Sequence, residues 1–403
     1  MGNELKPHIG IFGRRNYGKS SLINFITGQQ VAIVSSQPGT TTDPVRKSME
    51  IAGIGPVVLI DTAGIDDEGT VGNMRIQKSA DVLSQIDLAL ILFSDNRFES
   101  DESALVEACR SRQVPFLLVY SRADVAAPDN DFVAAVESRF HSTVFRLSVH
   151  DSSLRDPLLH AIAQSLPESA YRHPSLLADV VSSGDTVVLV APIDSSAPEG
   201  RMILPQVQVL RDLLDNHAVA VVCQPAELPR TLDSLSRPPR LVVTDSQVYR
   251  QVSEMVPDEV FLTSFSVVLA RAKGLFEQFL QGTPAIDTLS DGDRVLILES
   301  CTHNVTCEDI GRVKLPKLLQ KYTKHNIVCD IVAGQSPIIR PISDYALVIQ
   351  CGGCVITPRQ VRSRIEPALL ANVPVSNYGL AIAYMNGIFH RAIRIFQSFP
   401  TRP

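Results

Sequence analysis

The 403-residue sequence lacks any apolar run of the ~18 residues that a membrane-spanning helix needs. Its first residues show no basic stretch followed by an apolar core and a cleavage site. Lys6 also occupies the position where a myristoylation signal requires Ser or Thr. We therefore expect a cytoplasmic protein with no membrane partner.

Features typical of RNA-binding modules are missing as well. The sequence has no run of Lys and Arg interleaved with aromatic residues and no GXXG loop between helices of the kind found in KH domains. Its formal net charge is −6, and its 45% hydrophobic and 20% charged residues are ordinary for a globular protein. These features argue against a nucleic-acid partner.

Cysteines are few and unevenly placed. Seven is an odd number for a disulfide framework, and the cytoplasm is reducing, so disulfides are not expected. Most of the cysteines lie near the end of the chain, where they indicate a site of their own: Cys301, Cys307, Cys329, Cys351 and Cys354.

Strand-like and helical patterns alternate along almost the whole chain, which predicts an α/β fold with parallel sheets. The alternation breaks at a proline-containing linker after residue 165 and restarts twice on a smaller scale. We predict three domains, at residues 1–168, 180–280 and 281–403. Near the end of the chain, NYGLAIAYMNGIFHRAI is expected to form an apolar core helix.

A phosphate-binding loop opens the first domain. GRRNYGKS, residues 13–20, matches G-x-x-x-x-G-K-S and stands between a predicted strand and a predicted helix, which is the context that the motif requires. Its backbone N–H groups and the helix N-terminus favour phosphate. The residues expected to contact nucleotide or Mg²⁺ here are Gly13, Arg14, Arg15, Asn16, Tyr17, Gly18, Lys19, Ser20 and Ser21.

Later motifs indicate that the nucleotide is GTP. PGTTTD supplies Thr41 as a Mg²⁺ ligand, and DTAG supplies Asp61 for the metal and Gly64 for the γ-phosphate. SRAD stands where Asn-Lys-x-Asp reads guanine, so Asp124 keeps the base contact and Arg122 lies along the base. LSVHD, which contains Ser148, occupies the place of the last guanine motif.

The order GxxNxGKS, PGTT, DTAGI resembles the potassium-activated TrmE/Era GTPases over about 165 residues. Ile65 follows DTAG where Ras-like enzymes have a water-orienting glutamine, so hydrolysis cannot use that group. The resemblance implies that Asn16 holds K⁺ and that Thr41 binds Mg²⁺. With Lys19, these residues are the predicted catalytic set of a P-loop GTPase domain, which two smaller α/β domains follow.

Two cysteine motifs end predicted strands of the third domain. CTH, residues 301–303, follows VLILES, and CGGC, residues 351–354, follows YALVIQ. The carboxyl ends of parallel strands open on one edge of a sheet, so the two motifs are expected to converge there. Three thiolates suit an iron–sulfur cluster, and three thiolates with His303 equally suit zinc; a site without metal is the third possibility.

The whole arrangement resembles the HydF family of FeFe-hydrogenase maturation GTPases. The resemblance implies that Cys301, Cys351 and Cys354 bind a 4Fe-4S cluster, with His303 as a further candidate ligand. It also implies a scaffold that receives a diiron precursor from two radical-SAM maturases and delivers it to apo FeFe-hydrogenase. A middle domain without chemistry of its own is consistent with a homodimer.

One residue departs from the family pattern, because Gln350 stands where the family has His directly before CxxC. Glutamine is a poor cluster ligand, so we expect an open iron site. The alternative function is an Era-like RNA- or ribosome-associated GTPase with a structural zinc tail, and a nucleotide-binding protein without turnover is a third. The regulatory hydrolysis of GTP to GDP and phosphate is the activity that we predict.

Overall fold

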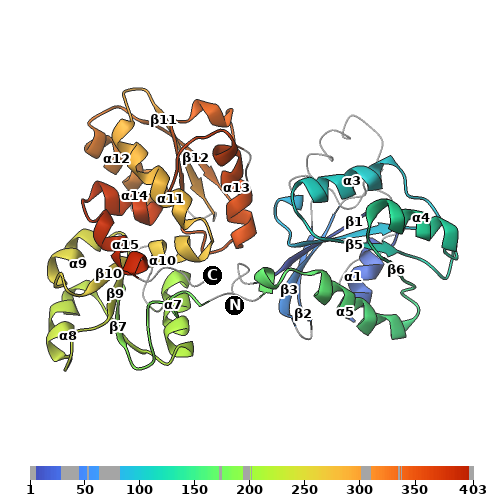
Figure 1. Ribbon diagram of the computed structural model, residues 1–403, viewed down its shortest axis with the longest axis horizontal. Coiled ribbons are helices and arrows are strands. Elements are labelled where there is room, and N and C mark those ends of the chain that lie inside the picture. The colour runs from blue at the N-terminus through green and yellow to red at the C-terminus, as the bar shows by residue number, and fades with distance from the viewer. Residues whose placement is uncertain are drawn as a thin grey trace. The chain divides into compact units, whose positions relative to one another are not determined.

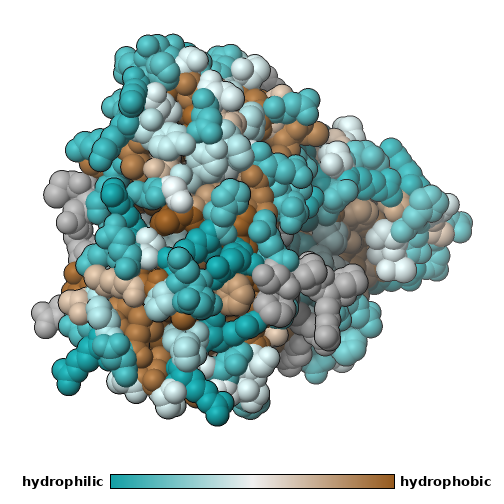
Figure 2. All heavy atoms as spheres, turned by 60° about the vertical axis from the view of Figure 1, so that its left-hand side comes forward, coloured by the Kyte–Doolittle hydropathy of each residue, from teal (hydrophilic) through white to brown (hydrophobic). Residues whose placement is uncertain are grey.

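The structure, a computed structural model, describes residues 6–28, 45–51, 54–62, 82–171, 175–193, 200, 202–300, 310–334, 336 and 338–398. It divides into two compact units, Met1–His173 and Pro174–Pro403 (Figure 1). Within the described ranges, no helix is long and apolar enough to cross a membrane. On the face drawn in Figure 2, hydrophilic residues predominate, and hydrophobic residues are exposed in smaller areas.

The first unit is built on one six-stranded sheet, in the order β2-β3-β1-β4-β5-β6. All pairs are parallel except β2 with β3. The strands are β1 His8–Gly13, β2 Val45–Ile51, β3 Gly55–Asp61, β4 Leu88–Phe93, β5 Phe116–Tyr120 and β6 Val144–Arg146. The helices are α1 Lys19–Thr27, α3 Ser100–Ser111, α4 Asn130–Phe140, α5 Arg155–Ser165 and α6 Glu168–Tyr171.

Successive side chains of the central strands point to opposite faces of the sheet, which gives this unit two separate hydrophobic cores. Phe12 and Ile91 face one side of the sheet, where α3 and α4 cover them. Ile11 and Leu90 face the other side, which α1 and α5 cover. The predicted α/β fold with a parallel sheet between two helical layers is therefore confirmed.

The second unit contains two four-stranded sheets, in the orders β10-β9-β7-β8 and β12-β11-β13-β14, and all their pairs are parallel. Its strands are β7 Thr186–Val190, β8 Val219–Cys223, β9 Leu241–Thr244, β10 Phe261–Ser264, β11 Arg294–Glu299, β12 Val328–Ala333, β13 Leu347–Gln350 and β14 Val375–Asn377. Its helices are α7 Leu204–Asp215, α8 Leu228–Ser234, α9 Tyr249–Met255, α10 Phe265–Ala272, α11 Phe276–Gly282, α12 Leu315–Thr323, α13 Pro358–Leu370, α14 Tyr378–Met385 and α15 Phe389–Ser398.

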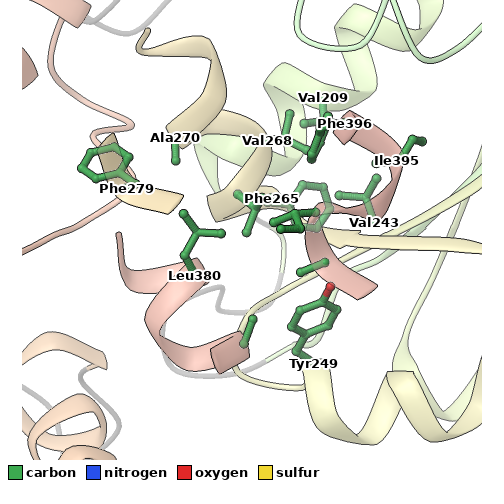
Figure 3. Packing of buried hydrophobic residues seen from close by; sticks show 14 of the residues in the cluster. Val209, Val243, Tyr249, Phe265, Val268, Ala270, Phe279, Leu380, Ile395 and Phe396 are labelled. Carbon is green, nitrogen blue, oxygen red and sulfur yellow. The ribbon is translucent and has the colours of Figure 1, made fainter. Parts of the chain in front are cut away.

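One hydrophobic core joins the two sheets. Figure 3 shows Phe265 and Val268 of α10 packed with Ile395 and Phe396 of α15, which comes from the far end of the chain. The Thr263 hydroxyl also donates a 2.8 Å hydrogen bond to the carbonyl of Ala392 in α15. The last helix, α15, packs on β10 in the sheet of the middle segment. The domain boundary that we placed at residue 280 stays a prediction.

The apolar segment near the end of the chain is not one helix. It begins as β14, continues as α14 and turns before α15 begins. Gly387 has a φ of 74° in this turn, a conformation that glycine adopts without the cost that a side chain brings. The expectation of a single core helix is wrong for this reason. Nearly all of α14 is buried, whereas α15 buries only its apolar face.

Candidate functional site

The phosphate-binding loop connects β1 to α1 and has the backbone that its sequence predicts. Gly18 has a φ of 85° and Asn16 a φ of 63°, so both lie in the left-handed region. A Cβ on Gly13 would lie 2.8 Å from the Leu92 carbonyl oxygen, which leaves no room for another residue there. The Lys19 ammonium group donates to the carbonyl oxygens of Gly13 and Arg14, at 2.8 and 2.9 Å, and so lies across the loop.

Ser20 and Asp61 form the candidate magnesium side of the site. The Ser20 hydroxyl donates to Asp61 Oδ2 at 3.2 Å. Burial raises the pKa of Asp61, against the opposing effects of Lys19 and Ser20. The other oxygen of this buried carboxylate, Oδ1, has no hydrogen-bond partner within the described part of the chain. A hydroxyl beside an unsatisfied carboxylate fits a divalent ion and its water shell.

The other loop residues differ in where their side chains lie. The Arg14 guanidinium turns to α3, where Nε donates to Glu102 Oε1 at 2.6 Å. Arg15 and Ser21 are half-buried, and the Tyr17 side chain is buried. The predicted nucleotide contacts Thr41 and Gly64 lie outside the described residues.

The predicted guanine-reading motif, residues 121–124, follows β5. The buried Ser121 hydroxyl donates to the Tyr17 carbonyl oxygen at 2.8 Å, so it fastens this motif to the phosphate-binding loop. Arg122 has a φ of 57°, and Asp124 is partly exposed beside it. The side-chain hydrogen bond from Ser148 lowers the pKa of Asp124. The structure thus brings Arg122, Asp124 and Ser148 together.

The second candidate site lies at the carboxyl ends of β11 and β13. These strands pair in parallel, with Leu298 opposite Gln350. Cys351 follows β13 directly, and the Ser300 N–H lies 3.1 Å from its sulfur. The backbone that leads into Cys301 is therefore next to Cys351, as expected from the parallel strands.

The cysteine loop itself is tight. Gly353 has a φ of 65°, and a Cβ there would lie 2.9 Å from a methyl of Val361. The side chains of Cys351 and Cys354 are both half-buried. Cys301 and His303 lie outside the described residues, and among those that are described no group of three or more metal-binding side chains occurs. Soft thiol ligands on a glycine-rich loop suit iron–sulfur or zinc chemistry.

The middle segment contributes contacts to this loop that the sequence did not indicate. Lys273 donates to the Ile356 carbonyl oxygen at 2.7 Å, just after the loop. The Ser266 hydroxyl donates to Asn377 Oδ1 at 3.1 Å, and Asn377 Nδ2 donates to the Gln350 carbonyl oxygen at 3.2 Å. Residues of α10 and β14 thus hold the loop in place, so the middle segment is part of the site rather than only a packing domain.

Three family models match this chain. Residues 176–274 match the model described as the hydrogen maturase F dimerization domain, and residues 277–395 match the hydrogen maturase F tetramerization domain. Residues 8–122 match a model described as a 50S ribosome-binding GTPase. The two maturase models together span more than half of the 403 residues.

Curated relatives match part of this chain. The chain is 38% identical over 130 residues to the tRNA modification GTPase MnmE of Nitrosomonas europaea, covering 32% of this chain and 29% of the relative. It is 33% identical over 157 residues to MnmE of Desulfotalea psychrophila, covering 39% of this chain and 33% of the relative. The chain thus spans about a third of the length of these relatives.

Among solved structures, an Era variant of Aquifex aeolicus bound to GDP and aluminium fluoride is 17% identical to this chain. The TM-score is 0.37, and the alignment covers 55% of this chain and 93% of that one. The family matches, not this likeness, carry the assignment of the first unit as a GTPase domain.

Proposed function

Because the chain belongs to the hydrogen maturase F (HydF) family, we propose that it is a potassium-activated GTPase that binds a C-terminal 4Fe-4S cluster and acts in hydrogenase maturation. In this proposal it carries a diiron subcluster, which radical-SAM maturases supply, to apo FeFe-hydrogenase. The observation that carries the cluster assignment is the 3.1 Å approach of the Ser300 N–H to the Cys351 sulfur. It brings Ser300, the residue before Cys301 in the sequence, to the CGGC loop.

For GTP binding and hydrolysis, we propose the following roles for the residues of the site. Lys19 donates to the β- and γ-phosphates from its position across the loop, and Ser20 and Asp61 hold Mg²⁺, Asp61 through water. Asn16, at the exposed tip of the loop, holds K⁺, which supplies the positive charge that an arginine finger gives in other GTPases. Thr41 and Gly64 complete the set as proposed ligands outside the described residues.

In the cluster half, Cys301, Cys351 and Cys354 are the proposed ligands. A bound 4Fe-4S cluster supplies a redox-active docking point with one iron that no cysteine occupies. The chain's own contribution is to hold the loop: Asn377 fixes the Gln350 carbonyl group, and Lys273 fixes the chain at Ile356. His303 is proposed as a residue near the cluster, since Gln350 replaces the expected histidine.

We propose that the chain forms a homodimer through its middle segment. β8 is the outermost strand of its sheet, and its Val219 and Val222 are 51% and 46% exposed. An edge strand with exposed valines is a surface that a second chain can cover. GTP turnover would then change contacts between chains or with partners in the cytoplasm, while the cluster chemistry stays in the second unit.

The decisive experiment measures iron, sulfide and zinc per chain, with the EPR spectrum of the reduced protein, after reconstitution without oxygen. We expect about four iron and four sulfide per chain in a 4Fe-4S site. Cys351→Ala should lose them, whereas Cys329→Ala is the matched control, because Cys329 lies on β12 away from the loop. One zinc per chain and no cluster would favour the zinc-tailed GTPase instead.

A further inference from the structure

Three hydrogen-bond donors converge on the sulfur of Cys351. The Ser300 N–H lies 3.1 Å from Sγ, the Ser300 hydroxyl oxygen 2.9 Å and Gln350 Nε2 3.3 Å. Ser300 is 6% exposed and Gln350 is 1% exposed, so solvent has little access to these groups. Sulfur is a weak acceptor as a thiol, and a set of three donors around it fits a thiolate.

The orientation of the Gln350 amide follows from its neighbours. Its Nε2 lies 3.2 Å from the Cys351 carbonyl oxygen, a group that only accepts hydrogen bonds, so the NH₂ end must face it. The same nitrogen lies 3.0 Å from the Ser300 hydroxyl oxygen. The two N–H bonds are thus shared among an oxygen of Ser300 and two atoms of Cys351. A flipped amide would place its oxygen against this carbonyl oxygen, with no proton between them.

The Ser300 hydroxyl links the Gln350 amide to the Cys351 sulfur by two hydrogen bonds. Its hydroxyl oxygen accepts from Gln350, which leaves its own proton to be donated to Cys351 Sγ. A chain of donors in a buried site polarises each member and strengthens the last bond. The chain is fixed at its start, because Asn377 Nδ2 holds the backbone of Gln350.

We propose that Gln350 is a positioning residue which, with Ser300, tunes the cluster through hydrogen bonds to the Cys351 sulfur, in place of acting as a ligand. This inference rests on the proposed function, because it takes Cys351 as a cluster ligand. Hydrogen bonds to a ligating sulfur stabilise the more negative state, so they favour uptake of one electron from an external reductant. The cluster of this chain therefore has a higher reduction potential than it would have without these donors.

The test compares reconstituted Gln350→Leu and Ser300→Ala proteins with the wild type. Leucine approximates the size of glutamine but cannot donate, and alanine removes the hydroxyl while it keeps the backbone N–H. The readouts are iron per chain and an EPR-monitored redox titration. We expect Gln350→Leu to keep its iron and to show about a tenfold lower ratio of reduced to oxidised cluster at a fixed potential, which is 59 mV for a one-electron couple.

Ser300→Ala should shift the ratio in the same direction, and the double variant should shift it further than either single variant, because Gln350 and Ser300 each contact the sulfur directly. The two shifts should not add fully, because Gln350 also donates to the Ser300 hydroxyl. The matched control is Gln320→Leu, because Gln320 is an exposed glutamine on α12 that donates to the Ile327 carbonyl group. Unchanged potentials in both site variants with full iron content would overturn the inference. Loss of iron from both, with secondary structure intact by circular dichroism, would also overturn it and indicate a role in assembly. A wild type that takes up no cluster would instead reject the proposed function.

Discussion

At the scale of single residues, His8 makes the stability of the first unit sensitive to acid. It is 3% exposed at the start of β1, and its Nδ1 has no hydrogen-bond partner within the described part of the chain. Burial, together with the charge of Arg46, lowers the pKa of His8 from 6.5 to about 4. Asp87 does not reverse this, because its Oδ2 accepts the backbone N–H of His8 at 2.8 Å and lies 4.0 Å from Nδ1.

The sign of the effect follows from proton binding. Between pH 6.5 and about 4 the unfolded chain binds the proton of His8 and the folded chain does not, so the free energy of unfolding falls as the pH falls. We expect a loss of about 2 kcal/mol at pH 5 relative to neutral pH. Urea unfolding of His8→Gln should show a flatter pH dependence over this window. His160→Gln, at an exposed position on α5, should keep the wild-type slope; equal slopes in all three proteins would contradict the prediction.

Asn16 carries a second prediction at this scale. Its φ of 63° means that alanine would disturb the loop as well as remove the amide, so glycine is the cleaner substitution. We expect Asn16→Gly to lose the difference between K⁺ and Na⁺ in phosphate release, with at least a tenfold lower rate in K⁺, because a positioned charge at the transferred phosphate contributes that much or more. GTP affinity should change little. A variant that still prefers K⁺ would remove Asn16 from the cation site.

At the scale of elements, the ion pair between Arg14 and Glu102 joins the phosphate-binding loop to α3. Glu102 is fully buried, and the guanidinium of Arg14 is its cationic partner at 2.6 and 3.1 Å. The hydrogen bond with Glu102 raises the pKa of Arg14, so the guanidinium stays charged. Removing one partner from a buried pair leaves an uncompensated charge, which costs about 3–5 kcal/mol.

Arg14→Met should therefore lower the free energy of unfolding of the first unit by about 3 kcal/mol. The double variant Arg14→Met/Glu102→Gln should recover a large part of that loss, because glutamine needs no cation and still accepts the Glu99 N–H. Urea unfolding measures both. If Arg14→Met left stability unchanged but abolished GTP binding, Arg14 would be the nucleotide contact that its place in the motif predicts.

The elements also show which structural features the sequence pattern predicts and which it does not. Buried strands such as β4, whose residues LALILF are all apolar, were predictable, and so was the loop geometry that glycines impose at Gly13 and Gly18. The edge strand β2, VRKSMEI, was missed because its polar residues give no clear apolar alternation. The Ser121–Tyr17 bond joins residues 104 positions apart, and no local pattern contains it. The Ser266–Asn377 bond beside the cysteine loop, across 111 positions, was invisible for the same reason.

At the scale of the whole molecule, the shared core decides how the chain unfolds. The two maturase segments were predicted as separate domains, yet α15 packs against β10 and places Phe396 in contact with Phe276 of α11, at 5.6 Å between ring centroids. The side chain of Ile395 is fully buried in the same core. A cluster that draws on both sheets stabilises them together, so we expect residues 175–398 to unfold in one cooperative step.

Calorimetry of the full chain should therefore show two transitions. GTP with Mg²⁺ should raise only the one that belongs to the first unit, by about 2.7 kcal/mol at a ligand concentration one hundred times the Kd. Ile395→Ala should lower only the other, by about 2–5 kcal/mol, since it leaves a cavity in the common core. Leu370→Ala, at a position 80% exposed on α13, is the control and should shift neither transition appreciably. Ile395→Ala could instead split the second transition in two, which would mean that the middle and last segments unfold separately. That result would contradict a shared core and favour the three-domain division predicted from the sequence.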